Sequence, residues 1–274
     1  MKIALTGASG LVGAAIANAL VSHGHEVVSV RFRLEVPKLH AQEFSSAQIL
    51  VHDARDLQRR RPADSQRIIV NGSFALLDAA HAAGVRNVIF ISSVSAFDGC
   101  QSSYGKSKLQ VEQNVLAAGG LVVPPGMVFG DARRSIFGML TWHAQMPLLP
   151  VFDGGFQPLW FVHREDLAQV VALVASQEWR CLPSRIIAVS ADQPITFREV
   201  LKTLGLAQGK QLSVFPIPLR LVLGLLRFAE LLGIKLPLNS DGLAGFLESN
   251  PKLDFQTLRS LGVMPRVLSR ATAL

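Results

Sequence analysis

One tyrosine and one lysine in this sequence have the spacing that acid–base chemistry requires. Tyr104 is the only tyrosine, and Lys108 follows it by four residues, so on a helix both side chains lie on one face. An unperturbed phenol has a pKa of about 10, which a neighbouring ammonium group lowers by stabilising the phenolate. Ser92 and Ser93 end the preceding apolar segment and can hold a substrate oxygen. The pair indicates a general acid–base centre, with an ordinary surface pair as the alternative.

A glycine-rich loop near the N-terminus has the pattern of a phosphate-binding turn. The segment TGASGLVG places Gly7, Gly10 and Gly13 between a short apolar run and an apolar pattern at helical spacing. Gly7 allows a tight turn, Gly10 lets the backbone approach a pyrophosphate, and Gly13 lets helix and strand pack closely. The alternative is an ordinary glycine-rich turn. The predicted cofactor contacts in this loop are Gly7, Ser9, Gly10, Leu11, Val12 and Gly13.

The residue that follows the second predicted strand bears on the choice of cofactor. An acidic residue there would bind the ribose 2′-hydroxyl and favour NAD. This chain has Arg31, with Arg33 close behind. A guanidinium group suits a 2′-phosphate through forked, charge-assisted hydrogen bonds. The sequence therefore favours NADP over NAD, with a solvated surface arginine as the alternative.

Short apolar strands alternate with helices in the first half of the chain, which is typical of a doubly wound parallel α/β sheet. The expected strands are 3–5, 26–30, 49–51, 88–91 and 122–123, and the expected helices are 11–23, 73–83 and 102–118. Later elements are a helix at 166–176, a strand at 186–189 and a helix at 197–204 with Thr196 as its N-cap. We expect a dinucleotide-binding domain at 1–125 that also takes in 160–190, and a smaller substrate lobe at 126–159 and 191–274.

Composition limits the class of protein. The chain has 274 residues, of which 49% are hydrophobic and 17% charged, so it is too apolar to be disordered. Cys100 and Cys181 cannot form a disulfide framework, and the N-terminus has no signal-peptide pattern, so a cytoplasmic setting is expected. The net charge of +7 is scattered, which indicates anionic small ligands rather than nucleic acid. The histidines have no metal-ligand spacing, so no metal site is expected.

Two features of the second half have more than one interpretation. The apolar stretch 218–232 contains Arg220, Arg227 and Glu230, which argues against a transmembrane span. A buried lobe helix is the first interpretation, and an interfacial membrane helix or a dimer contact is the alternative. His163 is expected to end a strand near the substrate lobe and Asp166 to begin a helix, with substrate contact by His163 as the alternative.

With these segments in order, the sequence resembles the short-chain dehydrogenase/reductase superfamily. TGASGLVG, ISS and YGKSK carry the resemblance, and the nearest branch is the extended and atypical NAD-dependent epimerase/dehydratases. The segment NGSFALLDAAHAAGVRNVIFISS is similar to the family's central helix and strand. PPGMVFG resembles the segment that lines the nicotinamide, and FVHREDLAQVV is similar to a later strand and helix.

The resemblance implies a Rossmann-type fold with a C-terminal lobe closing over the cofactor. It implies that Ser93 polarises the substrate, that Tyr104 is the acid–base group, and that Lys108 orients the ribose and lowers the tyrosine pKa. Asn71 corresponds to a helix asparagine that supports proton relay. The further cofactor contacts implied are His52, Asp53, Ala54, Pro125 and Val128.

Several positions depart from the family pattern. Phe97-Asp98 stands where Tyr-Gly is usual, and Pro124 replaces an arginine of the nicotinamide segment. The stretch between Gly24 and Asn71 is short for the usual series of strands. We therefore interpret 49–51 as the fourth strand and 32–36 as a vestigial third. The rival interpretation makes Asp53 an adenine contact after strand three.

The predicted chemistry is hydride transfer between a nicotinamide and a carbon bearing a hydroxyl or carbonyl group. The substrate is a small molecule, either a nucleotide-sugar or a hydrophobic carbonyl compound, and a homodimer is an open alternative. A different class of function is a catalytically silent nucleotide-binding scaffold or accessory subunit of the same fold. Intact Ser93, Tyr104 and Lys108 argue against the scaffold.

Overall fold

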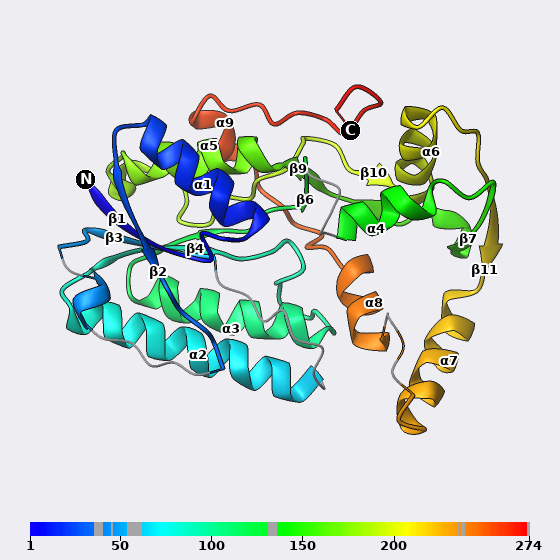
Figure 1. Cartoon of the computed structure of the whole chain (residues 1–274), viewed down its shortest axis with the longest axis horizontal. Coiled ribbons are helices and arrows are strands. Elements are labelled where there is room, and N and C mark those ends of the chain that lie inside the picture. Colours follow the sequence, from blue (N-terminus) through cyan, green and yellow to red (C-terminus); the bar gives the residue numbers. More distant parts are fainter. Residues whose placement is uncertain are drawn as a thin grey trace.

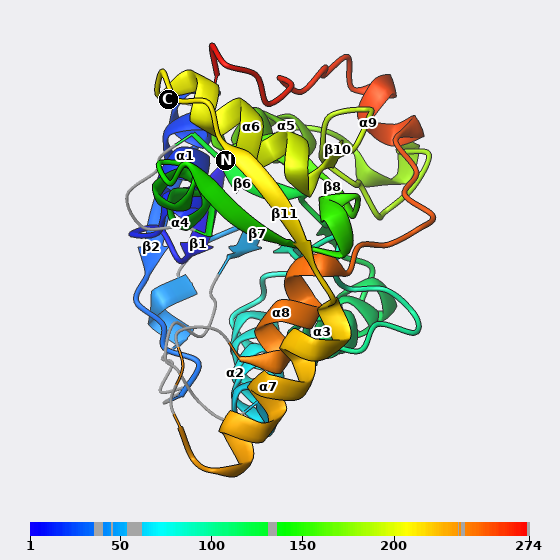
Figure 2. The ribbon, with the colours of Figure 1, turned by 90° about the vertical axis from the view of Figure 1, so that its right-hand side faces the viewer.

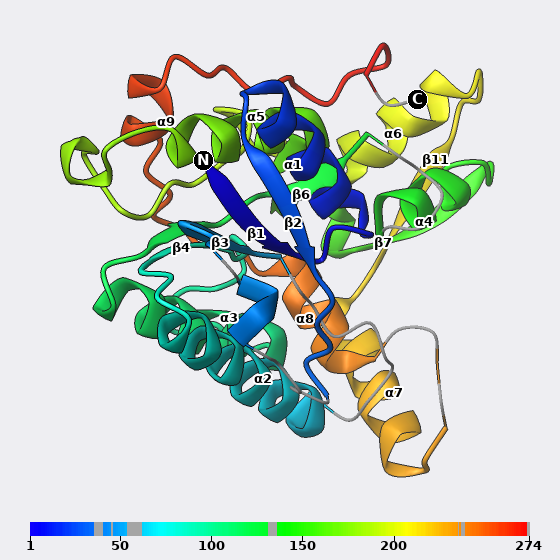
Figure 3. The same cartoon turned by 60° about the vertical axis from the view of Figure 1, so that its left-hand side comes forward.

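In the part of the chain that the structure describes, the main sheet has five parallel strands in the order β2, β1, β3, β4, β5 (Figures 1 and 3). The computed structural model describes residues 1–35, 41–44, 46–53, 62–130, 136–234, 236 and 239–272. The strands are β1 (Lys2–Thr6), β2 (Glu26–Val30), β3 (Ile49–His52), β4 (Asn87–Ile91) and β5 (Leu121–Val123). Parallel bridges from Val122 to Ile186 and from Pro125 to Val189 continue the sheet beyond β5. The expected doubly wound, Rossmann-like α/β fold is confirmed.

The position of β3 decides between the two interpretations of the segment 49–51. β3 pairs with β1 on the side away from β2, with Ile3 opposite Ile49 and Thr6 opposite His52. In the doubly wound order 3-2-1-4-5-6, a strand beside the first strand on that side is the fourth. The assignment as strand four is confirmed, and the rival assignment of Asp53 to the end of strand three is wrong. Residues 32–35 form no strand, and residue 36 lies outside the described residues.

Helices cover both faces of this sheet (Figure 1). One pair is α1 (Leu11–Ser22) and α5 (Arg164–Ala175), and the other is α2 (Pro62–Ala82) and α3 (Ser103–Ala117). α2 is longer than the predicted helix at 73–83, because proline is compatible with a first helical position and Ile69 and Val70 are buried. The two faces have separate apolar cores, one including Ile16 and Leu167 and the other Leu76 and Val111.

A second lobe lies beside the main sheet (Figure 2). It has its own apolar core, which includes Phe129, Phe137, Phe161 and Leu204. Its helices are α4 (Ile136–His143) and α6 (Phe197–Ala207), and the predicted N-cap Thr196 forms a capping box with Glu199. Its paired strands are β6 (Met127–Phe129) with β9 (Phe161–His163), β7 (Leu148–Phe152) with β11 (Ser213–Ile217), and β8 (Pro158–Leu159) with β10 (Ile195–Thr196).

The C-terminal part of the chain returns toward the main sheet. α7 (Leu219–Leu231) and α8 (Ser240–Leu247) follow the second lobe, and α8 packs against α3. Phe255 and Leu258, at the start of α9 (Gln256–Ser260), belong to the apolar core of the main sheet. The short 3-10 turns are η1 (Ala41–Phe44), η2 (Asp153–Gly155) and η3 (Trp179–Cys181). The division into domains at residue 125 stays a prediction.

No helix among the described residues combines the length and the apolar character needed to cross a bilayer. α7 corresponds to the apolar stretch predicted as a helix at 218–232. The first interpretation of that stretch as a buried lobe helix is wrong, because Leu226 is the only buried residue of α7.

Candidate active site

The glycine loop joins the end of β1 to the start of α1. Gly7 has a φ of +74°, and a Cβ atom built on it would lie 2.8 Å from the carbonyl oxygen of Asp53. A Cβ atom on Gly13 would lie 2.1 Å from the carbonyl oxygen of Gly7. Gly10 is the N-cap of α1 and makes no side-chain capping bond, and the first turn has no acidic residue. This backbone can therefore approach an anion closely, at the positive end of the helix dipole.

The other predicted contacts of this loop differ in exposure. Ser9 and Gly10 are exposed, Leu11 and Val12 are half-buried, and Gly13 is buried. Arg31 follows β2 directly and is exposed. Since β2 neighbours β1, Arg31 lies at the same carboxyl edge of the sheet as the glycine loop.

His52, at the end of β3, is fully buried between two hydroxyl groups. Its Nδ1 lies 3.0 Å from Thr6 Oγ1 and its Nε2 lies 2.9 Å from Ser73 Oγ. Burial, helped by the charge of Lys108, lowers the pKa of His52 to about 3. The neutral ring thus connects β1, β3 and α2 beneath the glycine loop. The adjacent Asp53 donates its backbone N–H to Thr6 Oγ1 over 3.1 Å.

Two predicted residues, Asn71 and Ala54, are close in sequence to members of this network. Asn71 is exposed on α2, whereas Ser73, two residues later, is buried and contacts His52. The polar side chain that α2 directs inward here is therefore Ser73, which sequence reasoning missed. Ala54 lies outside the described residues.

Lys108 connects α3 to the end of β4. Tyr104 lies in the first turn of α3 and is 37% exposed, whereas Lys108, one turn on, is only 3% exposed. Lys108 Nζ donates to the carbonyl oxygen of Ile91 over 2.9 Å and lies 4.7 Å from the centroid of the Phe90 ring. Ser93, two residues beyond Ile91, is half-buried, and its hydroxyl accepts from the backbone N–H of Ser95 over 3.2 Å.

Glu112 extends the same face of α3 by another turn and was not predicted as a site residue. Its side chain is buried, and burial raises its pKa to about 7. Ser92 and the charge of Lys108 act against that rise. Neither Glu112 Oε1 nor Ser92 Oγ has a partner at full hydrogen-bond geometry among the described residues. A buried carboxyl group that titrates near neutrality therefore lies behind the Tyr104–Lys108 pair.

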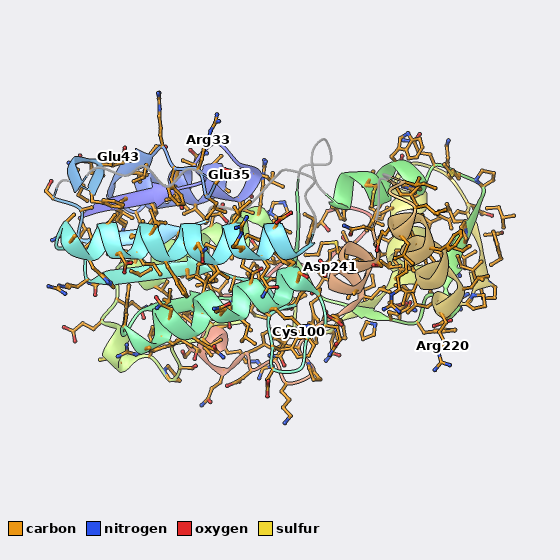
Figure 4. The ribbon with its side chains drawn as sticks, turned by 90° about the horizontal axis from the view of Figure 1, so that it is seen from below. Arg33, Glu35, Glu43, Cys100, Arg220 and Asp241 are labelled. Atoms are coloured by element: carbon orange, nitrogen blue, oxygen red, sulfur yellow. The ribbon has the colours of Figure 1, made fainter. Side chains whose placement is uncertain are left out.

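Two acidic residues on and just after α8 hold the N-terminus of α3. Asp241 Oδ1 accepts from the backbone N–H of Ser103 over 2.6 Å, and Figure 4 shows Asp241 where α8 meets the main domain. Glu248 Oε2 accepts from the N–H groups of Gln101 and Ser102 over 3.0 Å and 3.2 Å. Ser102 Oγ in turn accepts from Gly105 N–H over 3.1 Å. The first amides of the helix that carries Tyr104 are thus satisfied largely by a distant segment.

The remaining predicted residues lie on the neighbouring strand ends. The carbonyl oxygen of Pro125 accepts from Val94 N–H over 3.1 Å, just beyond Ser93. Val128 is half-buried on β6. His163 ends β9 and caps α5 by accepting from Glu165 N–H over 3.3 Å, and Asp166 lies in the first turn of α5. The predicted strand end is confirmed, and the helix begins at Arg164, two residues before the predicted start.

Comparison with known proteins places these features in a family. The model of a family described as "NAD dependent epimerase/dehydratase family" matches residues 3–187. A ceramide reductase of Caulobacter vibrioides (strain NA1000 / CB15N) is 28% identical over 186 residues, which cover 61% of this chain and 58% of that protein. The matched part therefore spans little more than half of that relative.

Solved structures share the whole fold. The UDP-glucose 4-epimerase of Thermotoga maritima, solved with UDP-glucose, is 17% identical, with a TM-score of 0.75 over 100% of this chain and 96% of that chain. The UDP-glucose 4-epimerase of Thermus thermophilus, solved with NAD, is 19% identical, with a TM-score of 0.73 over 100% of this chain and 96% of that one. At these identities the likeness establishes the fold alone.

Proposed function

The chain belongs to the NAD dependent epimerase/dehydratase family, and from that membership we propose that it is an NAD(P)-dependent oxidoreductase. The observation that carries the proposal is the contact of Lys108 Nζ with the carbonyl oxygen of Ile91. It fixes α3, which bears Tyr104, beside the strand end that leads to Ser93. An acid–base pair and an anion-binding loop therefore share the carboxyl edge of one parallel sheet, where ligands bind in such folds.

The residues of the glycine loop suit a dinucleotide. The contacts of Gly7 and Gly13 leave no space for a Cβ atom, so the loop presents backbone rather than side chains. When bound, the nicotinamide would donate or accept the hydride. Arg31 suits a 2′-phosphate, so NADP is the proposed preference.

Each catalytic side chain has a separate proposed task. The Ser93 hydroxyl holds the substrate oxygen, and the Tyr104 phenol gives a proton to that oxygen in reduction or takes it in oxidation. The ammonium group of Lys108 stabilises the phenolate and holds the cofactor ribose. Asn71, His52, Asp53, Ala54, Pro125 and Val128 remain proposed positions around the cofactor and the proton path.

The substrate class that we favour is a hydrophobic carbonyl compound, reduced to its alcohol. The likeness to ceramide reductase supports it, and so does the apolar C-terminal part of the chain. A nucleotide-sugar is the second candidate, because an epimerase solved with UDP-glucose matches the fold over the entire chain. A silent scaffold is the alternative from another class.

Replacement of Tyr104 by phenylalanine tests the proposal. The change removes the proposed proton donor and leaves the glycine loop intact, so turnover should fall by about 100-fold or more while cofactor affinity stays nearly unchanged. Turnover is measured as NADPH oxidation with a long-chain ketone and as conversion of UDP-glucose in the presence of the oxidised cofactor, and cofactor affinity is measured by fluorescence titration. A Tyr104→Phe protein with undiminished turnover would refute the mechanism.

Replacement of Lys108 by methionine separates catalysis from a scaffold role. Both turnover and cofactor binding should weaken, and the ionisation that governs the oxidative rate should move to higher pH because the phenolate loses its cation. Circular dichroism establishes that the variant is folded. An unmodified protein that binds NADPH but turns over no substrate of either class would support the scaffold.

A further inference from the structure

Helix α7 presents an apolar stripe to solvent. Leu221, Leu225, Phe228 and the C-cap Leu232 are 58%, 60%, 60% and 60% exposed. Their spacing of four, three and four residues places them along one side of the helix. Only Leu226 of α7 is buried, and α7 projects from the body of the molecule (Figures 1 and 3). The side of α7 that carries Leu226 packs on the protein, and the apolar stripe on the other side has no cover among the described residues.

The exposed apolar surface continues past the end of the helix. Leu231, Ile234 and Leu236 are also exposed. The end of the projecting segment thus carries further exposed apolar side chains directly after the stripe. An apolar patch of this kind is unusual on a surface that contacts only water.

Positive charge lies along one edge of the apolar stripe. Arg220 and Arg227 are exposed, and each directly precedes a residue of the stripe. Their separation of seven residues puts them on the same side of α7, and Arg220 points away from the body in Figure 4. The only acidic residue of α7, Glu230, faces α8 instead, where its carboxylate accepts from Ser240 N–H over 2.6 Å and from Ser240 Oγ over 2.8 Å.

We propose that α7 docks the protein on an anionic lipid bilayer. The apolar stripe enters the boundary between headgroups and acyl chains, and Arg220 and Arg227 meet the anionic headgroups, as in interfacial amphipathic helices. The net charge of +7 favours the same surface. A second copy of the chain fits less well, because antiparallel pairing of two α7 helices would bring their arginines together.

α7 is linked to the candidate active site through α8. α7 packs on α8, and α8 holds the N-terminus of α3, which carries Tyr104. The bilayer would therefore contact the molecule beside the proposed substrate lobe. This placement would suit an apolar substrate, but the docking itself does not depend on the proposed activity.

Vesicle flotation with the full chain tests the proposal. The protein should float with vesicles of phosphatidylglycerol and phosphatidylcholine and should bind vesicles of phosphatidylcholine alone much more weakly. Leu225→Ser combined with Phe228→Ser should lower vesicle binding by about tenfold or more, since two apolar side chains leave the interface. Arg220→Glu combined with Arg227→Glu should abolish the preference for anionic vesicles.

Matched controls lie on other surfaces. Leu206→Ser removes a similarly exposed leucine from α6, and Arg86→Glu reverses an exposed charge far along the chain from α7. Both controls should bind as the unmodified protein does. Absence of vesicle binding, or equal losses in the α7 variants and the controls, would overturn the proposal. A lipid-free dimer that Leu225→Ser/Phe228→Ser dissociates, seen by light scattering, would overturn it in favour of a second copy.

Discussion

Arg31 offers the most direct test of cofactor choice, because it directly follows β2 in an exposed position. We predict that NADPH binds at least several-fold more tightly than NADH. Arg31→Asp should reverse that order, since the carboxylate repels a 2′-phosphate and accepts from a 2′-hydroxyl. Isothermal titration with both cofactors measures the change. Arg86→Asp is the charge-matched control, and equal affinities for both cofactors in the unmodified protein would contradict the prediction.

Because of Glu112, the free energy of unfolding should decrease as pH rises, whereas an ion-paired carboxyl group makes it increase. Its pKa is about 7 in the folded protein and near 4.5 without burial, so the folded state binds more protons between these values. The free energy of unfolding should therefore fall as pH rises from about 4.5 to 7, by up to roughly 3 kcal/mol. Glu112→Gln removes this titration and should gain stability relative to the unmodified protein at pH 8 but not at pH 4.5.

Denaturant unfolding at the two pH values measures the Glu112 effect. Glu178→Gln, at an exposed glutamate, serves as the control and should leave the pH dependence unchanged. A Glu112→Gln protein with the same pH profile as the unmodified protein would show that the buried carboxyl group does not titrate in this range.

Among the elements, α8 holds the N-terminus of α3 through Asp241. Asp241→Ala removes the acceptor of Ser103 N–H, and loss of such a cap costs about 1 kcal/mol. We predict faster hydrogen exchange at the first turn of α3 and a several-fold lower kcat, because Tyr104 lies in that turn. Cofactor affinity should stay nearly constant, since the glycine loop lies between β1 and α1 and not on α3.

Asp241→Asn is the matched variant, because it keeps an acceptor oxygen and loses only the charge. It should restore most of the exchange protection and of the kcat. Unchanged exchange in Asp241→Ala would show that Ser102 and Glu248 hold the helix without it.

The elements also differ in how far local sequence could predict them. The strands, the glycine loop and the Tyr104–Lys108 face follow from short-range periodicity and turn chemistry. The contact of Asp241 with Ser103 joins segments 138 residues apart, and no local pattern encodes it. The resemblance indicates Asn71. The buried side chains of α2 determine which face of the helix turns inward, and that face carries Ser73 instead. Glu112 follows Tyr104 and Lys108 at the same four-residue spacing, so the sequence could have identified it as part of the same helix face.

At the scale of the molecule, cofactor binding should stabilise the fold as a whole. A ligand at 100 times its Kd adds about 2.7 kcal/mol to the free energy of unfolding. For a chain of this length, we predict that saturating NADPH raises the Tm by about 5–10 °C. Thermal unfolding followed by circular dichroism measures the shift. Arg31→Asp should lose most of the shift with NADPH, and no shift in the unmodified protein would contradict dinucleotide binding.

The core of the main sheet draws on both ends of the chain, and this bears on its synthesis. Ile3, Ile16 and Leu20 pack in one core with Leu167 of α5 and with Phe255 and Leu258. At roughly 5–20 residues per second on the ribosome, Phe255 and Leu258 are synthesised about 10–50 s after α1 and β1. During that time their apolar face is open to other nascent chains. We therefore expect the emerging polypeptide to depend on chaperones that cover apolar segments, and a slower ribosome to increase that dependence.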